Sequence, residues 1–188
     1  MATYSDFSPE QQNLDPTVLF DEKFALLKSV DKKEPRSSFD TIDFLTKCDE
    51  LVAMARQTED TERLKDALFF TLRVANSDMS YKKMALTATE LIKGGFDTET
   101  RARGYYARYL ANNRLAGMSH GQKRRDFLIR ARDDCGAMIL AVRSIEEPGE
   151  SAQDLVDALP AYQQEYESIL AQLEKKTLLQ RIGTLATR

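Results

Sequence analysis

Apolar residues recur every three to four positions along most of the chain, with charged residues between them. This spacing places the apolar side chains on one face of an α-helix. No stretch alternates apolar and polar residues for long enough to indicate a β-strand. The pattern predicts an all-α protein, an array or bundle of about seven helices in antiparallel pairs joined by short turns. The expected helices cover about 16–31, 40–56, 60–76, 80–93, 98–117, 120–143 and 161–182.

Local signals set the ends of several of these helices. Gly94–Gly95 indicates the end of one helix, because glycine adopts the left-handed conformation that closes many helices. For the same reason Gly117 is expected to be a left-handed residue that ends the next helix. Ser119 and Gln122 have the spacing of a capping box and predict the start of the helix that follows.

The chain length favours a single α-helical domain over residues 15–188, preceded by a flexible polar arm over 1–14. In the helix expected at 40–56, the predicted core stripe is Ile42, Leu45, Cys48, Val52 and Ala55. In the long final helix, the segment Tyr162–Leu173 is expected to pack on the domain. A second apolar patch, Leu178–Leu185, could contact the same domain, a partner or another copy of the chain.

Composition narrows the class of protein. Hydrophobic residues make up 42% and charged residues 30%, which is typical of a globular domain. No apolar run is long enough for a membrane span, and the N-terminus does not resemble a secretory signal. Cys48 and Cys135 each lie on an apolar helical face, so both are interpreted as core thiols. We therefore expect an intracellular protein, cytoplasmic or nuclear, with no membrane contact.

Positive charge is concentrated in one stretch. The whole chain has a net charge of −3, yet residues 97–132 contain nine Lys/Arg and three acids. This surplus lies in a predicted hairpin of two helices, which begins at a helix-capping Asp97 or Thr98. Such a local excess of one charge favours binding of the opposite charge.

The first helix of this hairpin has two distinct faces. At about 100° per residue, Gly104, Ala107 and Ala111 form a stripe of small residues that allows a neighbouring helix to approach closely. A second stripe combines arginines and an asparagine with flanking tyrosines. Together with two arginines of the next helix, it gives the predicted partner-binding residues: Arg101, Tyr105, Arg108, Tyr109, Asn112, Arg125 and Arg132.

Two family resemblances accompany this pattern. Paired helices of similar length with short turns resemble tetratricopeptide-type helical arrays. The run Gly104–Ala111, and within it Arg108–Ala111, is similar to one helix of the 14-3-3 proteins, with Ala107 as an insertion. In that family the Arg-Tyr pair of this helix holds a phosphate on a bound peptide. The resemblance therefore implies that Arg108 and Tyr109 contact a phosphorylated segment.

The residue inventory argues against an enzyme. His120 is the one histidine of the chain and lies in a predicted helix-capping turn. No Cys/His spacing suits zinc, and no glycine-rich loop follows a strand. Asp133 and Asp134 are adjacent in sequence, so they do not face each other on a helix. We expect no catalytic residue, no cofactor and no metal.

These observations predict a non-enzymatic protein–protein interaction module, an adaptor or regulatory subunit that recognises an acidic or phosphorylated segment. A less favoured alternative is a nucleic-acid-binding protein that uses the same basic surface. Another is self-assembly through the final helix. A further possibility is that Asp133, Asp134 or the acidic segment 146–157 neutralises the arginines within the fold.

Overall fold

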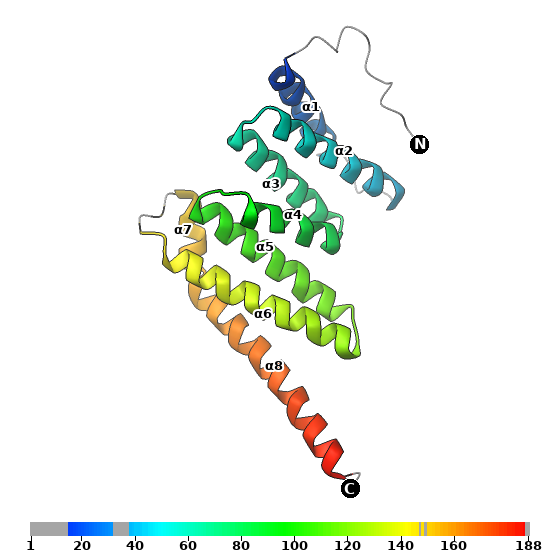
Figure 1. Ribbon diagram of the computed structural model, residues 1–188, viewed down its shortest axis with the longest axis vertical. Coiled ribbons are helices and arrows are strands. Elements are labelled where there is room, and N and C mark those ends of the chain that lie inside the picture. Colours follow the sequence, from blue (N-terminus) through cyan, green and yellow to red (C-terminus); the bar gives the residue numbers. More distant parts are fainter. Residues whose placement is uncertain (1–14, 32–37, 147, 149, 187–188) are drawn as a thin grey trace. The chain divides into compact units, whose positions relative to one another are not determined.

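The computed structural model describes residues 15–31, 38–146, 148 and 150–186, in which eight α-helices and no β-strand occur (Figure 1). The predicted all-α class is confirmed. The predicted N-terminal arm, residues 1–14, lies outside the described residues. The helices are α1 (Pro16–Asp31), α2 (Ser38–Gln57), α3 (Thr61–Ser77), α4 (Tyr81–Lys93), α5 (Thr98–Gly117), α6 (Gly121–Arg143), α7 (Glu150–Asp157) and α8 (Leu159–Ala186).

The chain divides into two compact units, an N-terminal unit (Met1–Val74) and a C-terminal unit (Ala75–Arg188). The boundary falls inside α3. The sequence predicted one domain over residues 15–188, and this grouping into two units was not anticipated.

Helix ends follow the predicted signals at some positions and depart from them at others. As predicted, Gly94 caps α4 and Gly95 is left-handed, with φ +76°. The left-handed ending predicted at Gly117 is wrong, because Gly117 is the last residue of α5 and the next residue caps it with φ −89°. The predicted capping box is also wrong. His120 is the N-cap of α6. The side-chain Nε2 of Gln122 donates to Asp126 Oδ1 at 2.8 Å and so does not reach back to the start of the helix.

An aromatic cluster forms the core of the N-terminal unit. The ring of Phe70 in α3 lies 5.5 Å from Phe24 of α1 and 6.4 Å from Phe44 of α2, measured between centroids. Ile42, predicted in this core, is 67% exposed, whereas Phe44 is buried. Two residues correspond to 200° of helix rotation, so the core stripe of α2 is centred away from Ile42.

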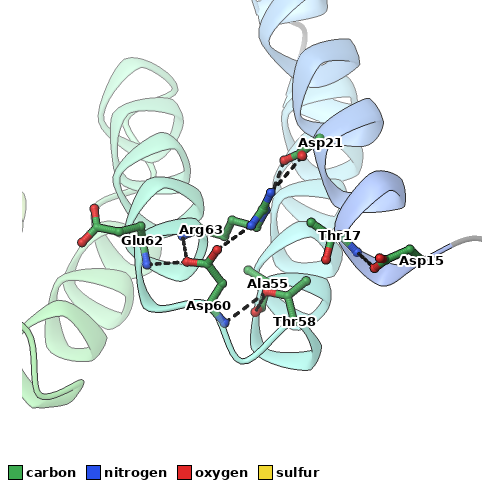
Figure 2. A network of polar contacts seen from close by, with 8 residues as sticks. All are labelled: Asp15, Thr17, Asp21, Ala55, Thr58, Asp60, Glu62 and Arg63. Atoms are coloured by element: carbon green, nitrogen blue, oxygen red, sulfur yellow. Dashed lines mark hydrogen bonds and ion pairs between the residues drawn. The ribbon is translucent and has the colours of Figure 1, made fainter.

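Polar contacts tie α1 to the start of α3 (Figure 2). Asp60 caps α3, since its Oδ1 accepts from the backbone N–H groups of Glu62 and Arg63. The guanidinium of Arg63 contacts Asp60 and also reaches Asp21 of α1, with Nε–Oδ1 at 3.2 Å and Nη2–Oδ2 at 3.0 Å. The backbone N–H of Arg63 is the main reason that the pKa of Asp60 is lowered. Asp21 is exposed and Asp60 and Arg63 are partly exposed, so each pair adds little stability.

In the C-terminal unit, α4, α5 and α6 lie side by side, and α5 packs against both neighbours (Figure 1). The stripe of small residues allows this arrangement as predicted, because Gly104, Ala107 and Ala111 are all buried. A Cβ atom on Gly104 would lie 3.2 Å from the Cβ of Leu91 in α4. The backbones of α4 and α5 therefore approach more closely than larger side chains would allow.

Helix α8 packs against α6 through the segment predicted to do so (Figure 1). Ile169 and Leu173 are buried in the core of this unit, and Tyr162 and Tyr166 pack against it. Gly136 of α6 leaves room for the Tyr166 ring, which would lie 3.3 Å from a Cβ at that position. The predicted second patch, Leu178–Leu185, lies outside the residues whose side chains are described.

Candidate interaction site on the α5–α6 hairpin

Arg108 and Asn112, one turn apart on α5, both bind the carboxylate of Asp134 in α6. Arg108 Nε and Nη2 lie 3.0 and 2.6 Å from Asp134 Oδ1. Asn112 Nδ2 donates to Asp134 Oδ2 at 2.9 Å. Asp134 is 5% exposed, so its charge depends on these two partners in place of water. This cluster joins α5 to α6.

The remaining contacts of Arg108 are also within the fold. Its Nη1 donates to Thr89 Oγ1 of α4 at 3.2 Å. Its guanidinium carbon lies 5.7 Å from the centroid of the half-buried Tyr105 ring. Because Arg108 contacts α4, α5 and α6, it holds three helices together. Asp134 therefore neutralises Arg108 within the fold, which was one of the alternatives that the sequence left open.

Tyr109 lies on another side of α5, in contact with α8. It is 3% exposed, and its hydroxyl donates to Glu165 Oε2 at 3.0 Å. Tyr106 adds a ring contact with Tyr162 of α8, at 5.3 Å between centroids. Burial, reinforced by Glu165, raises the pKa of Tyr109. Tyr109 therefore fixes α8 in place and does not share the surface of Arg108.

The other predicted residues are less enclosed. Arg101 is exposed, and its Nη2 lies 3.4 Å from Thr98 Oγ1 of its own helix. Arg132 pairs with the adjacent, exposed Asp133 at 2.6 Å. Arg125 is partly exposed, and no ion pair is described for it. The seven predicted residues thus do not form one continuous surface.

Three of the nine bases in 97–132 form ion pairs with acidic side chains. Besides Arg108 and Arg132, Arg103 pairs with Glu99 at 3.2 Å and with Asp154 of α7 at 2.9 Å. Nine minus three leaves six bases that form no ion pair within the part of the chain that the structure describes: Arg101, Arg114, Lys123, Arg124, Arg125 and Arg130. The three paired bases all lie away from the closed end of the hairpin, where α5 joins α6.

Four of the six bases surround the turn between α5 and α6: Arg114, Lys123, Arg124 and Arg125, called here the basic turn. Arg114 is in the last turn of α5, and the other three are in the first two turns of α6. Arg114 and Lys123 are exposed, and Arg124 and Arg125 are partly exposed. Arg130, further along α6, is 5.8 Å from the centroid of the Phe127 ring.

Sequence reasoning did not anticipate the roles of Thr89 and Glu165, and it gave Asp134 a role only in an alternative. A signal for Asp134 was available. It follows Phe127 and Ala131 and precedes Met138 at the spacing of a buried helix face. An acid at such a position requires a partner within the fold. Thr89 and Glu165 carry no comparable signal, because neither occupies a buried position of its helix.

The described residues contain no group of three or more His, Cys, Asp or Glu side chains placed to hold a metal ion. Among the described helices, none combines the length and the apolar character needed to cross a bilayer. Cys48 and Cys135 are buried thiols, as predicted. Burial raises the pKa of the Cys135 thiol to about 11.

Comparison of the chain with protein-family models, with curated proteins and with solved structures gives no match. The resemblances to tetratricopeptide arrays and to a helix of 14-3-3 proteins therefore stay predictions.

Proposed function

We propose that this protein is a non-enzymatic interaction module, an adaptor or regulatory subunit, that binds an acidic or phosphorylated protein segment at its α5–α6 hairpin. The observation that supports the proposal is the basic turn. Its four cations gather at one end of the hairpin and form no ion pair within the described residues. Of the predicted partner-binding residues, Arg125 belongs to this group.

The chemistry of the basic turn suits a carboxylate or a phosphate. An arginine presents two parallel N–H donors to such a group, and each charge-assisted contact contributes about 1.5–3 kcal/mol when it is partly shielded from water. Arg114 and Lys123 are exposed and Arg125 is partly exposed, whereas the Nε of the partly exposed Arg124 is buried without a hydrogen-bond partner among the described residues. By contrast, Arg108 and Asn112 already bind Asp134 and hold the hairpin together. We assign them a structural role that supports the site.

A protein segment is favoured over nucleic acid by the size of the charged surface. Nucleic-acid affinity depends on many simultaneous phosphate contacts. The basic turn offers four cations, and the whole chain carries a net charge of −3. A short acidic segment needs only two or three contacts of this kind.

Charge reversal at the basic turn tests the proposal. The variant Arg114→Glu/Lys123→Glu replaces two exposed cations for which no ion pair is described. The matched control is Lys93→Glu/Arg143→Glu, which changes two exposed cations at the opposite ends of α4 and α6 and produces the same net charge. The probes are a fluorescein-labelled glutamate-rich peptide, its phosphoserine counterpart and a single-stranded DNA oligonucleotide. Circular dichroism verifies that both variants are folded.

We expect the acidic peptide or the phosphopeptide to bind the wild-type protein, and binding to weaken as salt is raised. The basic-turn variant should lose at least about tenfold in affinity, equivalent to about 1.4 kcal/mol. The control should lose much less. Equal losses in both variants would show a general charge effect and contradict the proposed site. Stronger binding of the oligonucleotide would favour the nucleic-acid alternative.

A further inference from the structure

Two large apolar side chains are exposed in turns of the C-terminal unit. Met79, in the turn before α4, is 70% exposed, and Met118, in the turn before α6, is 71% exposed. Since α4, α5 and α6 are successive antiparallel helices, both turns lie at the same end of this unit (Figure 1). That end also carries the basic turn and the exposed Lys82 in the first turn of α4.

The backbone at Met79 is unusual for its residue type. Met79 follows α3 in the left-handed conformation, with φ +53°. Its N–H donates to Asn76 O at 3.1 Å, and the N–H of Ser80 donates to Ala75 O at 2.8 Å. These bonds form a Schellman motif, in which glycine is the favoured left-handed residue. Any other L-residue is strained there.

The side chain of Met79 makes few contacts within the fold that could offset this strain, because most of it is exposed to water. A turn ordinarily contains small or polar residues. Methionine is flexible and polarisable, and it is frequent at surfaces that bind apolar side chains of a partner. Met118 is an equally exposed methionine in a second turn at the same end. The two residues make this end both basic and apolar.

We propose that the partner segment carries apolar side chains between its acidic groups, and that Met79 and Met118 contact them while the basic turn and Lys82 bind the acids. This inference rests on the proposed function and defines the ligand of the same site more narrowly. The charge of the surface fixes the charge of the occupant, and the two methionines add an apolar requirement.

Helix geometry sets the length of this segment. Helices α4 and α6 both pack against α5, and packed helix axes are about 8–10 Å apart, so the starts of α4 and α6 are within about 20 Å. An extended chain of about six residues covers that distance. A short linear segment with two apolar side chains is therefore sufficient to reach both methionines.

Two labelled peptides of about seven residues test the inference against the full-length protein. In one, acidic residues alternate with leucine. In the other, the same acidic residues alternate with serine, so the charge is identical. For the wild-type protein, we expect the leucine peptide to bind roughly tenfold more tightly than the serine peptide. Fluorescence polarisation at one fixed salt concentration gives both dissociation constants.

The variant Met79→Gly separates a binding role from a structural one. Glycine removes the side chain and also relieves the left-handed strain, so the melting temperature should rise while the preference for leucine falls. Glu59→Gly is the matched control. Glu59 is exposed, follows α2 with φ +55° and belongs to the N-terminal unit. It should raise the melting temperature and leave the preference unchanged.

The double variant Met79→Gly/Met118→Ser should abolish the preference and retain binding of the serine peptide. Equal binding of the two peptides to the wild-type protein would overturn the apolar requirement and leave the proposed function intact. A preference that survives in the double variant would overturn the assignment to the two methionines. If neither peptide binds, the proposed function fails, and this inference fails with it.

Discussion

Arg108 Nη2 lies 2.6 Å from Oδ1 of Asp134, and this contact links α5 to α6 at a carboxylate that is almost completely buried. Removing one member of a buried ion pair is more damaging than removing both, because the remaining charge has neither water nor a counter-ion. We predict that Arg108→Ala lowers the free energy of unfolding by about 3 kcal/mol. Urea denaturation monitored by circular dichroism measures the change.

Arg132→Ala is the control for this prediction, since Arg132 pairs with the exposed Asp133. Its effect should be at most about 1 kcal/mol. The double variant Arg108→Met/Asp134→Asn removes both charges and keeps an oxygen that can accept from the buried Asn112, so it should recover part of the stability lost in Arg108→Ala. Similar losses for Arg108→Ala and Arg132→Ala would show that the Asp134 contact contributes no more than a surface pair.

The close approach of α4 and α5 gives a second prediction. A Cβ on Gly104 would lie 3.0 Å from Ile92 Cγ1 and 3.2 Å from Ala88 O, so in Gly104→Ala these α4 atoms must shift by a few tenths of an ångström, and one of them is backbone. Overpacking of this kind costs about 1–3 kcal/mol, against a gain of about 1 kcal/mol from helix propensity. A net destabilisation is expected. Gly117→Ala, where a Cβ would meet nothing within 4 Å, should be neutral or stabilising. Thermal unfolding measures the melting temperatures of both variants, which should differ in this direction.

A third prediction concerns alkaline pH. Burial raises the pKa of Cys135 from 9.0 to about 11 and the pKa of Tyr162 from 10.0 to about 12. Each group favours folding while it is protonated, so its contribution is complete below the unfolded pKa and is lost as pH rises through the folded pKa. Stability should therefore fall between about pH 9 and pH 12. Urea unfolding at a series of pH values measures this fall.

Replacing the thiol isolates its share of the effect. Cys135→Ala should flatten the decline between about pH 9 and pH 11, whatever it costs at neutral pH. An unchanged pH dependence in this variant would mean that the thiol ionises equally easily in the folded and unfolded states. The thiol should also react slowly with iodoacetamide at pH 8, because the thiolate is the reactive form.

The fourth prediction concerns the end of the chain. The apolar pattern of the final helix changes after Lys175, and the sequence places Leu178–Leu185 in a separate patch. This patch could contact the same domain, a partner or another copy of the chain, and sedimentation tests the last of these. If the patch joins two copies, the chain that ends at Lys176 should sediment with a lower mass than the full chain. It should stay folded, since it retains the core residues Ile169 and Leu173. Identical masses would exclude oligomerisation through the patch.

Hydrophobic periodicity was sufficient to predict the fold class and most of the helices. It also identified the small-residue face at Gly104 and the packing of Tyr162–Leu173, because both depend on side-chain size along a single helix. It placed Ile42 in the core wrongly, since a stripe of scattered apolar residues does not define the direction of the neighbouring helices. Phe44 fills that position.

The candidate site was harder to predict than the fold. Helix rotation correctly grouped Arg108 with Asn112, but it gave no information on which residues of other helices face them. Their partner, Asp134, follows them by more than twenty positions and became visible only when α5 and α6 were placed together. The left-handed backbone at Met79 could not be predicted either, because a methionine in the sequence gives no indication of a positive φ.

The bond between Tyr109 and Glu165 has a consequence for synthesis of the chain on the ribosome. The two residues are 56 positions apart, which at about 5–20 residues per second corresponds to a delay of about 3–11 s. Helices α4, α5 and α6 have all been translated by then, and the apolar surface around Tyr109 and Cys135 is open to other proteins until α8 emerges. A chaperone that recognises apolar surface would meet the nascent protein in this interval.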